Sequence, residues 1–434
     1  MSRAVAFDVL RQVTAEGTYA NLALSKRLAT AQLSSRDAAF VTELVSGTCR
    51  LMGSYDLVIE AAAGRRLNTL QPAVVDVLRL GAHQVLSMRI PPHAAVGATV
   101  DMAKKKIGAR VSGLVNAVLR KVARRSLDEW LDDAASGADA LAAAAIRGHH
   151  PVWVAEAFAD VLPHGELEAA LAADNVAPVP TLVVRPGLAT VEELGGEPTR
   201  YSPFGATAAG APGDVPAVRE GRAGVQDEGS QLVALALSRA EAPVGPWLDL
   251  CAGPGGKAAL LTGIAREAGT WLLANELQEH RATLVRGALQ AYPGAPVVVA
   301  DGTRPAWDAA SFAKVMADVP CTGLGALRRR PESRWRRSEA DVEALGGLQR
   351  GLLASALDSA VPGGVVAYAT CSPHRAETRD IVAAVLGTRD DAELLDAPSF
   401  LPEVPDASDG RFVQLWPHRH GTDAMFLALI RRTR

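Results

Sequence analysis

The second half of the chain alternates short apolar segments with longer amphipathic ones, and this alternation restricts the fold more than any other feature. The apolar segments have the length of strands and lie at 247–250, 271–274, 297–299, 314–316 and 364–368. Segments with helical periodicity lie between them, at 257–268, 277–290 and 345–360. Apolar strands separated by helices are typical of a parallel sheet covered on both faces. We therefore expect an α/β, doubly wound sheet over residues 222–434, with 425–430 as an added antiparallel edge strand.

Residues 1–145 show a different periodicity. Apolar residues recur at helical spacing, for example along 74–85 and 114–122, and no strand-like alternation is present. We expect five to seven helices in a bundle, with 128–145 as a partly helical linker. The stretch 1–127 carries 18 Lys and Arg against 8 Asp and Glu, although the whole chain has a net charge of −3. This asymmetry fits either a domain that binds a polyanion or a solvated basic bundle.

A third kind of segment lies between these two. Residues 146–221 contain one short apolar strand, 181–185, followed by frequent glycine and proline, which predicts a small α+β module. The sequence thus predicts three domains, 1–145, 146–221 and 222–434, in agreement with a length of 434 residues.

Composition excludes several classes of protein. No apolar run reaches the roughly 18 residues that a membrane span needs, and the first ten residues lack the apolar core of a signal peptide. The four cysteines, Cys49, Cys251, Cys321 and Cys371, form no CxxC pair, which argues against a disulfide scaffold and against a zinc or other metal site. We expect a cytoplasmic protein without a membrane or metal partner.

A glycine-rich turn follows the strand at 247–250. It comprises Cys251, Ala252, Gly253, Pro254, Gly255, Gly256 and Lys257, and it opens the helix at 257–268. Glycine lets the backbone pass close to a ligand, and a helix N-terminus favours negative charge. The spacing matches neither the dinucleotide nor the P-loop pattern. Glu276, at the end of the next strand, can accept hydrogen bonds from both hydroxyls of a ribose. Taken singly, the turn could be purely structural and the acid could only cap the next helix. Together, the turn and the acid favour a site for a nucleoside-bearing cofactor.

Two cysteines follow two later strands. Cys321 ends the run Asp318-Val319-Pro320-Cys321, and Cys371 lies within Thr370-Cys371-Ser372. Either cysteine alone would most simply be a small buried side chain. Two of them at strand ends, where open α/β sheets bind ligands, favour a catalytic pair beside the nucleoside pocket.

These motifs together resemble the RNA 5-methylcytosine methyltransferases, and most closely the bacterial 16S rRNA (cytosine-5)-methyltransferases of the RsmB branch. The stretches 3–10, 78–86 and 112–120 in turn resemble the NusB-type RNA-binding helical domain, which precedes the catalytic domain in that branch. The resemblance implies a Rossmann-like class I methyltransferase domain behind a NusB-like domain, S-adenosylmethionine as cofactor and RNA as partner.

The resemblance also implies roles for individual residues. Positions 251–257 line the S-adenosylmethionine pocket, Glu276 holds the ribose, Asp301 lies near the adenine and Asp318 lies where methyl donor and target base meet. Cys371 is the nucleophile, Cys321 assists release of the product, and Lys257 reaches toward the target base.

The chain departs from the family pattern at three positions. Val319 and Gly253 each stand where the family usually has alanine, and both changes are expected to be harmless. Thr378 stands where the family usually has asparagine, which puts the support of the loop after Cys371 in question.

The expected function is methylation of a cytidine of 16S ribosomal RNA at carbon 5 through a covalent cysteine adduct. The alternatives are the same chemistry on transfer RNA, and a non-catalytic RNA-binding or antitermination factor. The arginine-rich segment formed by 328–330 and 334–337, with Trp335 inside it, is interpreted either as a further RNA contact or as a solvated loop.

Overall fold

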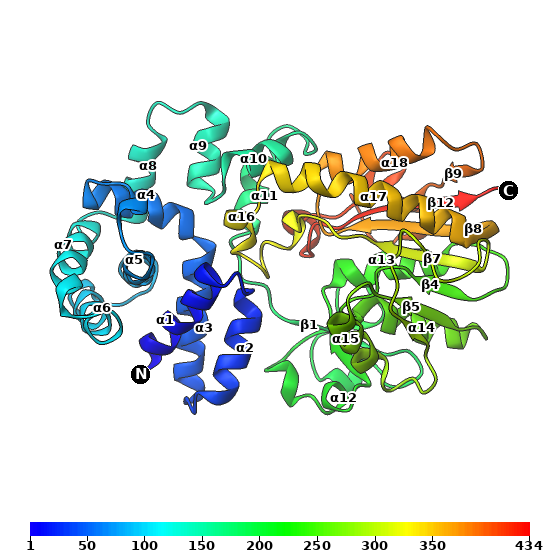
Figure 1. The fold of residues 1–434 in the computed structure, drawn as a ribbon, viewed down its shortest axis with the longest axis horizontal. Coiled ribbons are helices and arrows are strands. Elements are labelled where there is room, and N and C mark those ends of the chain that lie inside the picture. The colour runs from blue at the N-terminus through cyan, green and yellow to red at the C-terminus, as the bar shows by residue number, and fades with distance from the viewer. The chain divides into compact units, whose positions relative to one another are not determined.

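The computed structural model describes residues 1–434, which form two compact units (Figure 1). The helical unit comprises 1–176 together with 327–337. The other unit, called the catalytic unit because the sequence predicts the catalytic residues in it, comprises 177–326 and 338–434. No helix in either unit has both the length and the apolar character needed to cross a bilayer.

The helical unit is built from short helices joined by tight turns. It contains α1 (Ser2–Ala15), α2 (Ala20–Thr30), α3 (Ser35–Arg50), α4 (Met52–Ala63), α5 (Pro72–Leu86), α6 (Pro92–Lys106), α7 (Ser112–Val122), α8 (Leu127–Ala135), α9 (Ala140–Arg147), α10 (Val152–Ala159), α11 (Leu167–Ala173) and α16 (Ser333–Arg336). The expected bundle is therefore present with more helices than the predicted five to seven. The segment expected as a linker forms α8 and α9, and α8 begins with a capping box between Ser126 and Glu129.

Helix α5 lies at the centre of this unit and packs against α3, α4, α6 and α7. The apolar faces predicted along 74–85 and 114–122 meet here, because α5 and α7 approach closely at Gly81. A Cβ at Gly81 would lie 2.5 Å from Cδ1 of Leu119. The glycine therefore allows the two helices to pack at short range.

The helical unit extends past the boundary expected at residue 145. Helices α10 and α11 pack on α9 and on each other, so residues 146–176 belong with the helices. The rest of the expected α+β module forms a three-stranded antiparallel sheet of β1 (Thr181–Val184), β2 (Gly205–Thr207) and β3 (Ala223–Val225) in the catalytic unit.

The arginine-rich segment completes the helical unit, and its Arg334 and Trp335 form neither the RNA contact nor the solvated loop that the sequence suggested. The ring of Trp335 lies against Gly53, and its Nε1 donates to the carbonyl of Cys49 at 3.0 Å. Arg334 is fully buried and donates to the side-chain oxygen of Asn175 at 2.7 Å and to the carbonyl of Asp174 at 3.0 Å. These two side chains have a structural role because they donate hydrogen bonds to backbone and side-chain partners inside the unit.

The catalytic unit is built on a nine-stranded sheet. Its main strand order is β10-β11-β12-β8-β7-β4-β5-β6, and β9 also pairs with β12. The strands are β4 (Trp247–Asp249), β5 (Leu272–Asn275), β6 (Val297–Val298), β7 (Phe312–Asp318), β8 (Ala360–Thr370), β9 (Ala392–Leu394), β10 (Ser408–Asp409), β11 (Phe412–Gln414) and β12 (Phe426–Arg432). β4 to β8 are parallel, and β12 runs antiparallel to β8. β12 is thus antiparallel as predicted, but it is an interior strand because β11 and β9 pair beyond it.

Helices cover both faces of this sheet, as the sequence predicted (Figure 1). They are α13 (Glu228–Arg239), α14 (Gly256–Glu267), α15 (Glu279–Leu289), α17 (Glu339–Ser359) and α18 (Arg379–Leu386). The short helix α12 (Pro216–Arg219) packs against β3 of the small sheet, and α19 (Pro417–His420) lies between β11 and β12 in the sequence. α13, α14 and α15 form one apolar core with side chains such as Trp247 and Met316, while α17 and α18 form a second with Leu248 and Val315. Neighbouring residues of a strand enter opposite cores because side chains alternate along a strand.

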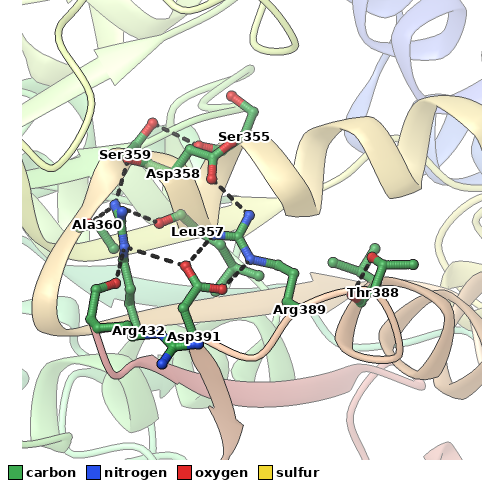
Figure 2. A network of polar contacts seen from close by, with 11 residues as sticks. Ser355, Leu357, Asp358, Ser359, Ala360, Thr388, Arg389, Asp391 and Arg432 are labelled. Carbon is green, nitrogen blue, oxygen red and sulfur yellow. Dashed lines mark hydrogen bonds and ion pairs between the residues drawn. The ribbon is translucent and has the colours of Figure 1, made fainter.

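An ion-pair network joins α17 to the antiparallel part of the sheet (Figure 2). Arg432 of β12 donates to the carbonyls of Asp358 and Ala360 at 2.9 and 2.8 Å. Arg389 donates to the carboxylate of Asp358 at 2.7 Å and to both oxygens of Asp391. Since β8 starts at Ala360, the network lies where the parallel strands begin, at the edge opposite their carboxyl ends.

Replacing Trp335 by alanine is expected to destabilise the helical unit by about 2–3 kcal/mol, because the change removes a half-buried ring and two hydrogen bonds to backbone carbonyls. The measurement is urea unfolding followed by far-ultraviolet circular dichroism. Trp271→Ala is the matched control, since Trp271 is 49% exposed and its loss is expected to cost less than about 1 kcal/mol. Equal effects of the two substitutions would contradict a packing role for Trp335.

Candidate active site

The predicted site residues gather at one edge of the catalytic sheet. The parallel strands β4, β5, β6, β7 and β8 all end there, since Asp249 lies opposite both Ala274 and Met316, and Asp318 lies opposite Ala369. The residues that follow these strands are the glycine turn after β4, Glu276 after β5, Asp301 after β6, Cys321 after β7 and Cys371 after β8.

The glycine turn brings the chain from β4 into α14. The N–H of Ala252 donates to the carbonyl of Asn275 at 2.8 Å, and the Gly253–Pro254 peptide is cis. Gly255 has a φ of +110°, and a Cβ there would lie 2.5 Å from Cβ of Ala288. Only glycine fits this position, because it needs both a left-handed backbone and a close approach to α15.

Glu276 and Arg281 hold Gly253 from both sides. The carboxylate of Glu276 accepts the N–H of Gly253 at 3.1 Å, and Nη2 of Arg281 donates to the Gly253 carbonyl at 2.7 Å. A Cβ on residue 253 would collide with Glu276 Oε2. The glycine at 253 is therefore more than the harmless change expected from the sequence, since it makes room for the acid.

Asp249 is a site residue that the sequence interpretation missed. It is 1% exposed, and neither carboxylate oxygen makes a hydrogen bond of normal geometry. Burial, followed by the negative charge of Asp318, raises the pKa of Asp249 to about 7, although Lys257 acts in the opposite direction. Its place at the end of an apolar strand, directly before the glycine turn, is the sequence signal that could have identified it. A buried unpaired carboxylate is costly, which is typical of a position kept for function.

Lys257 links the glycine turn to β7. Its ammonium donates to Oδ2 of Asp318 at 2.9 Å and to Oγ of Ser230 at 2.6 Å. Burial acts to lower the pKa of Lys257, but the charge and hydrogen bond of Asp318 outweigh it, and the pKa lies above its ordinary value. Lys257 is thus a fixed positive charge, within electrostatic range of Cys371.

The two cysteines meet across the ends of β7 and β8. Their sulfur atoms lie 3.5 Å apart, within hydrogen-bond distance for thiols. The hydrogen bond with Cys371 and burial together raise the pKa of the Cys321 thiol well above its ordinary value. The raised pKa favours the protonated form of the Cys321 thiol.

Two other predicted residues turn toward their own loops. Oδ1 of Asp301 accepts the N–H and the hydroxyl of Thr303 at 2.9 and 2.8 Å. Thr378, where the sequence left loop support in question, donates its hydroxyl to the carbonyl of His374 at 2.9 Å. The loop after Cys371 is therefore closed locally by the threonine itself.

Both parts of the chain match known families. Residues 233–431 match the family model described as 16S rRNA methyltransferase RsmB/F, and residues 1–124 match the NusB family. A putative methyltransferase of Mycobacterium tuberculosis is 48% identical over 99% of this chain and 96% of its own length. The ribosomal RNA small subunit methyltransferase B of Vibrio cholerae is 31% identical over 99% of this chain and 96% of its own length.

Solved structures share the fold. The crystal structure of PH0851 has a TM-score of 0.79 at 22% identity and covers 99% of this chain and 97% of its own. A methyltransferase homologue from Pyrococcus horikoshii has a TM-score of 0.54 at 20% identity and covers 68% of this chain and 99% of its own.

Asp249→Asn is expected to change how stability depends on pH. The pKa of Asp249 is about 7 in the folded chain and about 4 when unfolded, so the unfolded state loses its proton first and the wild type loses stability as pH rises from about 4 to 7. The asparagine variant lacks this loss. Its free energy of unfolding relative to wild type should therefore grow by up to about 4 kcal/mol between pH 4 and pH 8, measured by urea titration.

Asp301→Asn is the matched control for this titration. The Thr303 hydroxyl and N–H lower the pKa of Asp301, so the wild-type carboxylate stabilises the fold above the unfolded pKa and this contribution is lost as pH falls. The two variants should thus deviate from wild type in opposite directions. A flat difference for Asp249→Asn would show that its carboxylate is solvated.

Proposed function

This chain belongs to the RsmB/F family of 16S rRNA methyltransferases, and from that premise we propose that it methylates carbon 5 of a cytidine in small-subunit ribosomal RNA. The chain is an S-adenosylmethionine-dependent RNA methyltransferase. The single observation that carries the proposed chemistry is the pair of cysteine sulfurs 3.5 Å apart beside the Lys257–Asp318 ion pair.

The residues at the sheet edge fit S-adenosylmethionine. Asp249 supplies a buried carboxylate with unused oxygens, and Glu276 places a second carboxylate beside the glycine turn. We assign positions 251–257, Glu276, Asp301 and Asp318 to this cofactor, with Glu276 toward the ribose and Asp301 toward the adenine. Once bound, the cofactor supplies a methyl group on a positively charged sulfur.

The chemistry needs a strong nucleophile because carbon 5 of cytosine is unreactive by itself. The Cys371 thiolate adds to carbon 6, which moves electron density to carbon 5 so that this carbon can take the methyl group. Lys257 stabilises the thiolate by its charge. We assign to Asp318 the acceptance of a hydrogen bond from the protonated ring nitrogen 3 or from the amino group of the base, which has to leave its stack to reach the pocket.

Release of the product reverses the addition. A base removes the proton from carbon 5, the two electrons of that bond form the ring double bond, and the Cys371 sulfur leaves carbon 6 as a thiolate. Cys321 lies next to that sulfur and carries a proton in the resting enzyme. We assign to Cys321 the assistance of this release.

The helical unit offers a basic surface for RNA. A groove of 610 Å³ is lined by four cationic side chains, Arg3, Arg36, Lys105 and Lys106, against two acidic ones, Asp37 and Asp101. Phosphates are held mainly by such cations. We infer that this unit binds the RNA backbone, which favours ribosomal RNA over transfer RNA because the domain is NusB-like. The intact cysteine pair favours an enzyme over a non-catalytic binding factor.

Cys371→Ala is expected to abolish methyl transfer to RNA while the dissociation constant for S-adenosylmethionine stays within about threefold, because the thiol contacts the base and not the cofactor. The measurement is incorporation of labelled methyl groups, with cofactor binding by calorimetry as the control. Full activity of this variant would move the nucleophile role to another residue. Bisulfite mapping of ribosomal RNA from cells with and without the protein tests the target.

Cys321→Ala is expected to accumulate a covalent protein–RNA adduct, since addition proceeds through Cys371 but release is slowed. The adduct would appear as a band of reduced mobility on a denaturing gel. The double variant Cys321→Ala, Cys371→Ala should form no such band. An adduct that persists in the double variant would contradict the assignment of the attacking sulfur.

A further inference from the structure

A completely buried carboxylate connects the two cysteine loops. Glu377, in the loop after β8, has no exposed surface. Its Oε1 accepts the N–H of Thr322 at 2.8 Å, and its Oε2 accepts the hydroxyl of Thr322 at 2.5 Å. Thr322 directly follows Cys321, so the carboxylate of one loop holds the backbone and side chain next to the cysteine of the other.

Helix α17 adds a third support to this carboxylate. Nε2 of Gln349 donates to Oε1 of Glu377 at 3.2 Å and to the carbonyl of Pro320 at 2.9 Å. The hydroxyl of Tyr368 donates to the backbone carbonyl of Glu377 at 2.7 Å. Each group that bonds to the Glu377 carboxylate is a donor, so the carboxylate acts only as an acceptor. Through Thr322 directly and through Gln349 to Pro320, it fixes the residues on both sides of Cys321.

The cysteine loops touch directly at two further points. The N–H of Gly325 donates to the carbonyl of Cys371 at 2.8 Å, and the hydroxyls of Thr322 and Ser372 lie 3.3 Å apart. These contacts constrain Cys321 less than the Glu377 carboxylate does. Gly325 lies four residues from Cys321, and the contact between Thr322 and Ser372 joins two neutral groups. A charged acceptor forms the stronger hydrogen bonds.

We propose that Glu377 is a positioning residue that sets the distance between the sulfurs of Cys321 and Cys371 by clamping Thr322. The importance of this distance for catalysis rests on the proposed function. The contacts between Glu377 and Thr322 are a property of the fold and do not depend on it. The carboxylate also places a negative charge near Cys321, which adds to the hydrogen bond and burial that raise the pKa of its thiol. Position and charge thus both keep Cys321 as the protonated partner of the pair.

Three variants separate the clamp from the charge. Thr322→Val replaces the hydroxyl that faces Glu377 Oε2 by a methyl group of similar size, whereas Thr322→Ser keeps the hydroxyl and is the matched control. Glu377→Gln keeps an acceptor for the Thr322 N–H, and its amide can donate to the Thr322 hydroxyl oxygen. This last variant therefore removes the charge and preserves the geometry.

The first readout is formation of a disulfide between Cys321 and Cys371 in the full chain, with glutathione disulfide as oxidant. Two thiols are oxidised to one disulfide while glutathione disulfide is reduced to two thiols. The rate reports how the sulfurs are placed and requires no RNA. We expect Thr322→Val to slow this step by at least tenfold, Thr322→Ser to stay within twofold of wild type, and Glu377→Gln to shift its pH profile to lower pH.

The second readout is methyl transfer. We expect Thr322→Val to lower kcat by about tenfold or more, with the dissociation constant for S-adenosylmethionine unchanged. A Thr322→Val enzyme that matches Thr322→Ser in both readouts overturns the clamp, and an unshifted pH profile in Glu377→Gln overturns the role of the charge. If Glu377→Gln does not fold, the comparison of Thr322→Val with Thr322→Ser still tests the clamp. If the wild type methylates no cytidine, the proposed function fails while the disulfide rates still test the clamp.

Discussion

Parallel pairing of β4, β7 and β8 in one register is the constraint on which the site depends. β4 ends at Asp249, opposite Met316 and two residues before the end of β7. β7 ends at Asp318, opposite Ala369 and one residue before the end of β8. A shift of one residue would turn every side chain of a strand to the opposite face. Because both faces are packed against helices, such a shift would move each side chain into the other apolar core, whose packing it does not fit. The two apolar cores therefore fix the positions of the catalytic side chains.

The site concentrates groups that a stable core would avoid. Asp249 is buried without a partner, Lys257 and Asp318 form an ion pair in a mostly enclosed position, and Glu377 is fully buried. Removing charges from water has a high free-energy cost. The remainder of the unit has to offset this cost. The network of Arg389, Asp391 and Arg432 at the opposite edge of the sheet is one contribution, since it joins α17 to the antiparallel strands away from the chemistry.

Much of the catalytic unit could be predicted because its signals are local. Apolar strands, the glycine turn and the residues after each strand lie within short stretches of sequence, and the alternation of strands with helices predicts a parallel sheet. The start of α17 was placed at 345, whereas the helix begins at Glu339. The capping box of Ser338 and Asp341 is a local signal that a closer examination could have used.

Other features depend on contacts between distant parts of the sequence and could not be predicted in this way. Trp335 and three arginines in a row look like a nucleic-acid contact, but Trp335 lies against Gly53, nearly three hundred residues away. Glu377 lies in a loop with no distinguishing composition, and its importance emerges only from Thr322 and Gln349. The limits of α10 and α11 were also missed, because their partner α9 was expected to be a linker.

The insertion of 327–337 into the helical unit has a consequence for how the chain is made. A ribosome synthesises the first 176 residues well before the segment that completes their fold. At about 5–20 residues per second, the slot beside Gly53 stays empty for roughly 8–30 seconds of translation. During that interval the nascent unit exposes the backbone carbonyls and apolar surface that Trp335 later covers. The amino-terminal unit thus reaches its final form only after strands β4 to β7 of the catalytic sheet have been synthesised, while β8 to β12 are still to come.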